Sequence, residues 1–225
     1  MRLLQSMPVL SILMLLFFPV AWLAGRALGF RGFDAWFLDV RGSTMVLLLV
    51  CFAAAIGAKA FAVYLGMHLG IYQVLSTNFS LSLMAVCSAL MMTFFPSVAE
   101  DIVTRGFVMR VFPRERHWLA LVFISSIVYV LNHIYRLANG PIEWLMLFCF
   151  GLAYASVMAA SRSLWPAVGL HWGWNFAGGI SDQVADINLL DRSSQSLLSA
   201  GVHLLIFAVC IVWVRFRVRN ENDAV

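Results

Sequence analysis

Three groups of polar side chains interrupt the apolar stretches of this sequence. Their members are Glu100, Asp101 and Arg105 in the first group, His133 in the second, and His171 and Asn175 in the third. Ionisable side chains inside apolar helices are costly and usually face the interior of a bundle. If the groups meet, a carboxylate, two imidazoles and an amide surround one point. A carboxylate and an imidazole can take a proton from water, and nearby donors can stabilise an oxyanion.

The spacing within the groups indicates how the side chains are oriented on helices. Asp101 and Arg105 are four residues apart, so they share a helix face and can form an ion pair. Glu100 is turned about 100° from Asp101, which leaves it free for another partner. His171 and Asn175 are also four residues apart, so both can point into one cavity.

Each group also has a purely structural interpretation. The first can be an ion pair that joins helices, His133 can be a hydrogen-bonded interior histidine, and His171 with Asn175 can link helices through polar contacts. Convergence at one depth favours a site instead. At about 1.5 Å per residue, Glu100 lies about 18 Å, His133 about 24 Å and His171 about 10 Å from helix ends expected on the same side of a membrane. All three can therefore meet near mid-membrane depth.

Long apolar segments must position these groups. Of the 225 residues, 62% are hydrophobic and 12% are charged. Apolar stretches of about 18 or more residues predict transmembrane helices. Seven segments follow: 8–28, 44–67, 81–112, 117–138, 142–160, 164–180 and 196–216. The predicted fold class is all-α, a polytopic transmembrane helical bundle of about seven spans with a candidate catalytic cavity at mid-membrane depth.

Within this bundle, we expect three parts. Residues 1–80 form N-terminal transmembrane helices, and residues 81–180 form a helical core that contains all three polar groups. Residues 181–225 form a C-terminal transmembrane helix and a basic tail. Pro96 is expected to kink the long third segment, because proline removes a helical hydrogen bond.

The distribution of arginines predicts the orientation, because cytoplasmic loops are enriched in Lys and Arg. One set of loops holds Arg26, Arg31, Arg41, Arg105, Arg110, Arg114, Arg116, Arg162, Arg215, Arg217 and Arg219, and the other holds Arg2, Arg136 and Arg192. We therefore expect a cytoplasmic C-terminus and an external N-terminus in a bacterial inner membrane. The net charge of +4 is spread along the chain and indicates no nucleic-acid partner.

The polar groups also lie in segments that resemble known motifs. "EDIVTR" resembles the EExxxR motif of the CPBP intramembrane proteases, which include the CAAX prenyl endopeptidases. "YVLNH" resembles the FxxxH motif of that family, and "HWGWN" matches its HxxxN motif. The resemblance covers residues 81–180. Asp101 stands where the family has a second glutamate and Tyr129 where it has a phenylalanine, and neither departure removes an expected catalytic group.

The resemblance implies a glutamate-dependent intramembrane endopeptidase that cleaves a substrate near its C-terminus at the membrane. By motif position, Glu100 would activate the attacking water with help from His133, and His171 with Asn175 would stabilise the oxyanion. Asp101 and Arg105 would fix the helix that carries Glu100. The implied partners are the lipid bilayer and a membrane-associated protein or peptide, either lipidated or carrying a C-terminal sorting tail.

Two alternatives stay open. One is a non-catalytic membrane protein of the same fold, acting as an immunity factor or scaffold. The other is a zinc-dependent protease with Glu100, His133 and His171 as ligands, since three protein ligands suffice for a catalytic zinc. We expect no cofactor. The sequence lacks a close histidine pair on one helix, and Asn175 shares a face with His171, whereas a ligand histidine prefers an acceptor for its other N–H.

Overall fold

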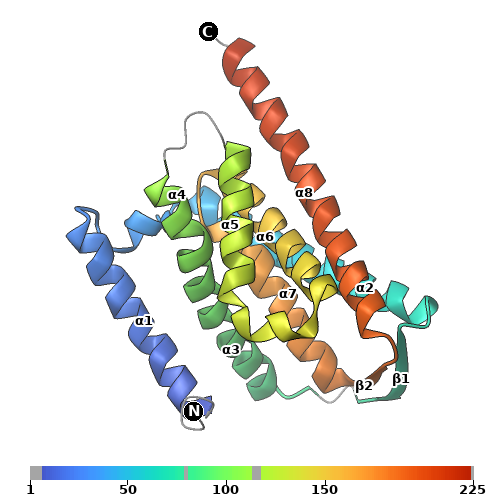
Figure 1. Ribbon diagram of the computed structural model, residues 1–225. Helices are drawn as coiled ribbons and strands as arrows, with labels where there is room; N and C mark the ends of the chain where they lie inside the picture. Colours follow the sequence, from blue (N-terminus) through green and yellow to red (C-terminus); the bar gives the residue numbers. More distant parts are fainter. Residues whose placement is uncertain (1–6, 79–80, 113–117, 224–225) are drawn as a thin grey trace.

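Helices make up nearly all of the described structure and form one bundle (Figure 1). The computed structural model describes residues 7–78, 81–112 and 118–223, with side chains described between residues 14 and 214. The α-helices are α1 (Met7–Ala27), α2 (Gly42–His68), α3 (Leu83–Asp101), α4 (Phe107–Val111), α5 (Trp118–Asn132), α6 (Pro141–Ser161), α7 (Trp165–Val184) and α8 (Arg192–Asp223). Arg2, Arg114 and Arg116, used in the topology prediction, lie outside the described residues.

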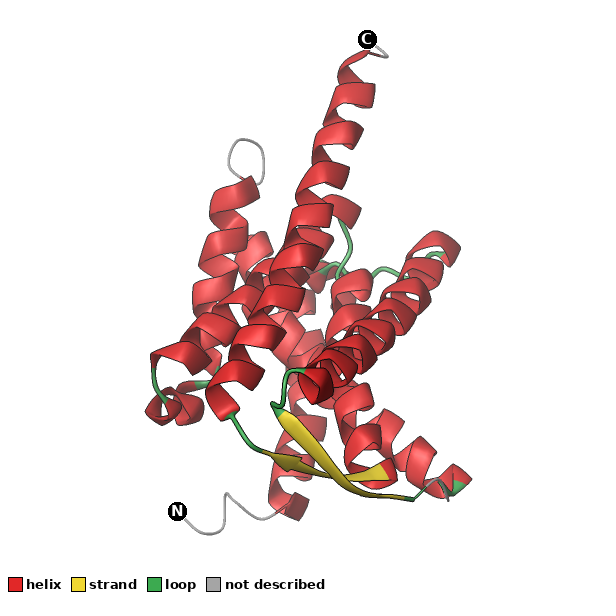
Figure 2. Ribbon diagram, turned by 90° about the vertical axis from the view of Figure 1, so that its right-hand side faces the viewer, coloured by secondary structure: helices red, strands yellow, loops and turns green. Residues whose placement is uncertain are grey.

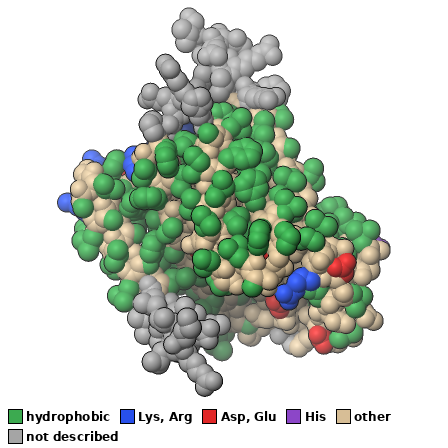
Figure 3. Space-filling model, in the orientation of Figure 1, with side chains coloured by type: hydrophobic (Ala, Val, Ile, Leu, Met, Phe, Trp, Pro, Cys, Tyr) green, Lys and Arg blue, Asp and Glu red, His purple; other side chains and the backbone are tan. Residues whose placement is uncertain are grey.

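The predicted all-α class is confirmed, and helices occupy all seven apolar segments. Four described helices are long and apolar enough to cross a membrane, at Gly42–His68, Leu83–Val111, Pro141–Ser161 and Arg192–Val214. Two shorter apolar helices cover Met14–Ala27 and Trp118–Asn132. Hydrophobic side chains cover most of the face seen in Figure 3, as expected for a surface in contact with lipid. The count of seven spans stays a prediction.

A close contact between α2 and α7 fixes the helix that carries His171. A side chain added at Gly169 would collide with the backbone carbonyl oxygen of Leu48, and one added at Gly173 would collide with that of Phe52. Small residues four apart allow helix backbones to approach in membranes. His171 lies midway between the two glycines and therefore on the opposite face of α7. The contact holds α7 from behind and directs His171 toward α3.

The third apolar segment contains an irregular turn after Pro96, and the kink expected at Pro96 itself stays a prediction. α3 continues through Pro96 to Asp101. A π-helical turn, η3 (Ile102–Gly106), then joins it to α4. Such turns often occur at functional sites, because the wider turn re-orients the side chains around it. The turn follows Asp101 directly and begins two residues after Glu100.

A small sheet closes one end of the bundle, where the sequence predicted no strand. β1 (Tyr72–Thr77) pairs with β2 (Ala185–Leu189) in an antiparallel ladder. The register is irregular between Val74 and Ser76. Figure 2 shows the two strands crossing beneath the helices. The sheet ties the chain after α2 to the link between α7 and α8, and α8 extends past the bundle at the opposite end (Figure 1).

Candidate active site

Glu100 lies next to both predicted histidines. Its Oε2 atom is 3.6 Å from Nε2 of His133 and 3.8 Å from Nε2 of His171. The three side chains come from α3, from the end of α5 and from α7. The structure therefore brings together the carboxylate and both imidazoles that the sequence places at one depth. The Glu100 side chain is 27% exposed, whereas those of His133 and His171 are 7% and 3% exposed, so the carboxylate is the accessible member.

A break in the helix positions His133. α5 ends at Asn132, and a 3₁₀ helix, η4 (Ile134–Asn139), follows His133. The predicted helix over 117–138 was therefore too long, because the chain must turn before Pro141 begins α6. Nδ1 of His133 lies 2.9 Å from the carbonyl oxygen of Tyr129. A carbonyl only accepts, so Nδ1 carries hydrogen and Nε2 faces Glu100.

His171 is oriented by a carboxylate. Its Nδ1 atom lies 2.9 Å from Oδ1 of Asp101, and both side chains are buried. Asp101 therefore accepts from the second ring nitrogen of His171. The sequence alone indicated no such acceptor. One of the two points that favoured a metal-free site no longer holds, since ligand histidines are commonly oriented in this way.

The predicted ion pair between Asp101 and Arg105 is confirmed, and it is fully buried. The Arg105 guanidinium also donates to Oγ1 of Thr104 at 2.9 Å. Its central carbon lies 4.6 Å from the ring centre of Tyr129 and 4.9 Å from that of Tyr154. A buried arginine needs such compensation, because burying a charge is costly and aromatic faces attract cations.

Hydroxyl groups stabilise the irregular turn that follows Glu100. Thr104 donates through Oγ1 to the carbonyl oxygen of Glu100 at 2.7 Å. Ser125 of α5 donates through Oγ to the carbonyl oxygen of Thr104 at 2.7 Å. The second bond joins the π-helical turn to the helix that leads to His133. These bonds fix the backbone on which Glu100 sits relative to α5.

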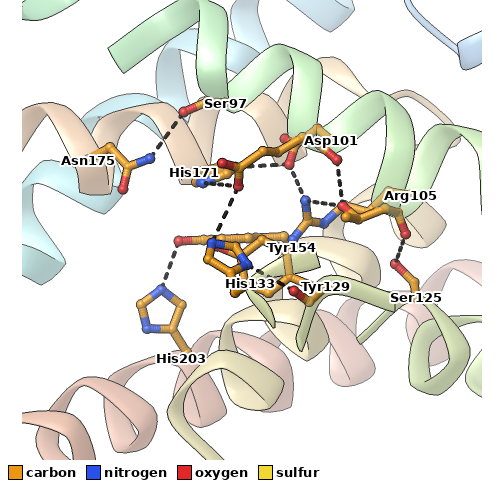
Figure 4. Close-up of polar contacts among 12 residues, drawn as sticks. Ser97, Asp101, Arg105, Ser125, Tyr129, His133, Tyr154, His171, Asn175 and His203 are labelled. Carbon is orange, nitrogen blue, oxygen red and sulfur yellow. Dashed lines mark hydrogen bonds and ion pairs between the residues drawn. The ribbon is translucent and has the colours of Figure 1, made fainter. Parts of the chain in front are cut away.

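Asn175 lies beside this group rather than in polar contact with it. Its Nδ2 atom donates to Oγ of Ser97 at 3.3 Å, and Figure 4 shows the amide turned toward that hydroxyl. Among the described residues, no hydrogen bond joins Asn175 to Glu100, His133 or His171. The shared helix face predicted for His171 and Asn175 therefore places them near each other on α7 without making them contact one partner.

Sequence reasoning missed two side chains that adjoin the site. The Tyr154 ring on α6 stacks on the His171 ring, with centres 5.0 Å apart and planes 21° apart. The Tyr154 hydroxyl lies 3.1 Å from Nε2 of His203 on α8 (Figure 4). No motif contains either residue. The signal for His203 was available, because a lone histidine inside a hydrophobic span is itself a candidate functional residue.

The donor types around Glu100 also suit zinc. However, no group of three His, Cys, Asp or Glu side chains within the described part of the chain is arranged to hold a metal ion. The four cysteines, Cys51, Cys87, Cys149 and Cys210, are free thiols, and none of them forms part of a metal-binding group among the described residues.

Comparison with known families places the polar groups in one segment. Residues 82–177 match a family model described as type II CAAX prenyl endopeptidase Rce1-like. This match confirms the resemblance carried by the three motifs, and the matched segment runs from the start of α3 into α7. Neither a comparison with curated proteins nor one with solved structures gives a significant match. The match and the apolar helices together support an intramembrane endopeptidase that acts on a peptide substrate in the bilayer.

Proposed function

We propose that this protein is a glutamate-dependent intramembrane endopeptidase, with Glu100 as the base that activates water. The observation that supports this role is the position of the Glu100 carboxylate beside Nε2 of both His133 and His171. Separations of 3.6 and 3.8 Å exceed a direct hydrogen bond, and they suit groups that share one water molecule. The matched family segment contains all three residues.

In the proposed reaction, a water held by Glu100 and His133 attacks the carbonyl carbon of the scissile peptide bond. Glu100 takes one proton as the new C–O bond forms. His133 orients the water, because its Nε2 lone pair accepts the second hydrogen. Glu100 then returns its proton to the departing amine nitrogen as the C–N bond breaks. The products are a carboxyl group and an amine, and no other reactant is needed.

His171 is proposed to stabilise the oxyanion of the tetrahedral intermediate. Because Nδ1 donates to Asp101, Nε2 can donate to the oxyanion only when the ring is doubly protonated. In that form, the carboxylate of Asp101, which accepts from Nδ1, offsets the positive charge of the ring. Asn175 is proposed as the second donor, since an amide nitrogen has two hydrogens and only one is used on Ser97. Preorganised donors of this kind account for a large share of catalysis in acyl transfer.

The proposed substrate is a membrane-associated protein or peptide cleaved near its C-terminus, and either a lipid group or a sorting tail would bring it to the bilayer. The proposed location is a bacterial inner membrane with the C-terminus in the cytoplasm. A cysteine placed at Arg114, outside the described residues, should then be protected from a membrane-impermeant thiol reagent applied to intact cells. If this cysteine were labelled before permeabilisation, the predicted orientation would be wrong and the C-terminus would lie outside the cytoplasm.

Glu100→Gln tests the function directly. The probe is an internally quenched peptide with a prenylated cysteine three residues from its C-terminus, and the protein is reconstituted in liposomes. We expect cleavage to fall about 1,000-fold, since a general base commonly contributes about 100- to 10,000-fold. Glu143→Gln makes the same change at a glutamate that lies outside the proposed catalytic group, and cleavage should fall no more than about tenfold. An equal loss in both variants would contradict the assignment.

A zinc mechanism is the second candidate, because acceptors orient Nδ1 of both His133 and His171 and leave both Nε2 atoms facing Glu100. We expect the metal-free route, so cleavage should survive exhaustive dialysis against a chelator. Elemental analysis should then find sub-stoichiometric zinc. The zinc mechanism would be established instead if the chelator inactivated the protein and about one equivalent of zinc restored cleavage. In that case zinc should not restore cleavage in the His133→Ala variant.

A further inference from the structure

A buried histidine lies on α8, beyond the segment that matches the family model. His203 is 1% exposed. Its ring stacks on Phe150, with centres 3.6 Å apart and planes 21° apart, and Trp174 meets it edge-on at 4.5 Å. Two neighbouring helices, α6 and α7, therefore fix the ring. A polar side chain is costly inside a hydrophobic span, so it usually has a hydrogen-bond partner and a functional role.

The contacts of His203 define its tautomer. Nδ1 lies 2.8 Å from the carbonyl oxygen of Ser199, which can only accept, so Nδ1 carries the hydrogen. Nε2 then presents a lone pair. It lies 3.1 Å from the Tyr154 hydroxyl, so Tyr154 donates and His203 accepts. The direction of the bond is therefore set by the backbone of α8.

Tyr154 transmits this constraint to the site. Its ring lies face to face with the His171 ring, and Tyr129 meets His171 edge-on at 5.8 Å. Asp101 holds Nδ1 of His171. One edge and one face of the His171 ring are thus occupied, and Nε2 is left facing Glu100. A tilt of Tyr154 would tilt the stacked imidazole with it.

We infer that Tyr154 and His203 are positioning residues that set the ring orientation of His171. The inference rests on the oxyanion role proposed for His171. Without His203 the buried Tyr154 hydroxyl would have no acceptor, and an unsatisfied buried hydroxyl is costly enough to make the ring move. Donors to an oxyanion must be placed accurately before the reaction, so a small rotation of His171 lowers turnover more than it affects substrate binding.

The competing interpretation is a hydrogen bond that only holds α6 against α8. The two interpretations differ in what each variant changes. Tyr154→Phe removes the hydroxyl and keeps the stacked ring. His203→Leu removes the acceptor, and His203→Gln restores a side-chain acceptor that can reach the same hydroxyl. Cys210→Ala is the matched control, because Cys210 is buried on α8 two turns further along, and no hydrogen bond between described residues joins it to Tyr154.

The kinetic arm measures kcat and KM for the quenched prenylated peptide in liposomes. We expect Tyr154→Phe and His203→Leu each to lower kcat about tenfold, with KM changed by less than about twofold. The double variant should fall no more than about twofold below either single variant, because the two residues act as one unit. His203→Gln should recover most of the loss. If Cys210→Ala lowers kcat as much as His203→Leu at an equal loss of thermal stability, the positioning role is wrong.

The spectroscopic arm needs no cleavage. The chain has five histidines, so ¹⁵N-histidine labelling of the detergent-solubilised protein gives a tractable NMR spectrum. We expect His203 as the Nδ1–H tautomer, and ring signals of His171 that move in Tyr154→Phe and His203→Leu but not in Cys210→Ala. Unmoved His171 signals would overturn the inference. Moved signals in a protein that cleaves no peptide would support the positioning and contradict only the proposed function.

Discussion

Two arginine–carboxylate pairs lie near the candidate site, and they act on it in different ways. Asp101 and Arg105 are one turn apart on the same helical segment, and both side chains are 0% exposed. Arg136 of η4 pairs with Glu143 in the first turn of α6, with side chains 35% and 7% exposed. The first pair is buried beside the groups proposed to be catalytic, whereas the second lies where the chain turns between two helices.

The carboxylate of each pair has a further partner, and that partner shows what the pair controls. Asp101 also contacts Nδ1 of His171, so its charge acts on an imidazole. Glu143 also accepts from Oγ of Ser196 at 3.3 Å, so it joins η4 to α6 and α8. η4 starts directly after His133, and the second pair therefore holds the backbone that sets this histidine. The same residue types contribute electrostatics in one place and chain geometry in the other.

Among the variants that test the comparison of the two pairs, Asp101→Asn is expected to have the largest effect on cleavage. Asparagine can still accept from His171 but cannot stabilise its imidazolium, so we expect cleavage to fall about 100-fold, less than in Glu100→Gln. Arg105 would be left buried without a counter-charge, which should cost about 3 kcal/mol of unfolding free energy. Cleavage assays and thermal unfolding in detergent measure the two effects.

Ser126→Ala is the control for that experiment. Ser126 is equally buried but donates only to the carbonyl oxygen of Val122 in its own helix. Its loss should change neither activity nor stability strongly. If Asp101→Asn matches Glu100→Gln in activity and leaves stability unchanged, Asp101 takes part in the chemistry itself.

A smaller effect is expected at the second pair. Arg136→Gln should lower cleavage about threefold, because η4 gains freedom and His133 moves with it. The stability loss should be near 1 kcal/mol, as for a partly exposed pair. A double-mutant cycle with Glu143→Gln should give a coupling energy of about 1 kcal/mol. Zero coupling in both stability and kcat would show that the pair does not position His133.

The smallest effect is expected at Asp191, an exposed carboxylate that caps α8. It accepts from the backbone N–H of Ser193 at 2.9 Å and from the Ser194 hydroxyl at 2.7 Å. These hydrogen bonds lower the pKa of Asp191 below its ordinary value, and the bond from the Ser194 hydroxyl contributes most. The stabilisation is therefore present above the unfolded-state pKa of about 3.9 and is lost as the pH falls through the lower folded-state value.

Asp191→Ala should accordingly lower the melting temperature slightly at pH 7, and the difference from the parent protein should vanish once the pH has fallen through the folded-state pKa of Asp191. Asp186→Ala, at an exposed position of β2, is the control. A difference that persists unchanged into acid would mean that the carboxylate of Asp191 is not what stabilises the helix start.

The sequence predicted contacts between residues close together on one helix. It also predicted which side chains lie at the same depth in the membrane. The Asp101–Arg105 pair follows from a four-residue spacing on one helix, and the meeting of Glu100 with two histidines follows from helix rise. The contact between Asp101 and His171 could not be predicted, because it depends on how α3 and α7 are rotated about their axes. The same holds for Asn175, whose shared helix face did not decide which partner it contacts.

Other features lack any local signal. The π-helical turn after Asp101 arises from packing and hydroxyl contacts across helices, and neither Pro96 nor the residues of the turn indicated it. The early end of α5 at Asn132 is set by the turn toward Pro141. The strands β1 and β2 pair segments more than 100 residues apart, and six or fewer residues of mixed polarity give no clear alternation.

The close contact between α2 and α7 has a consequence for how the protein is made. α2 leaves the ribosome about 100 residues before α7, and contacts between distant segments form late. Glu100 and His133 thus enter the bilayer after α2 but before α7, which carries His171, has been made. The acceptor for Tyr154 arrives later still, with α8. A partly translated chain therefore carries an incomplete site, and the proposed peptidase site is complete only after α7 and α8 have been inserted.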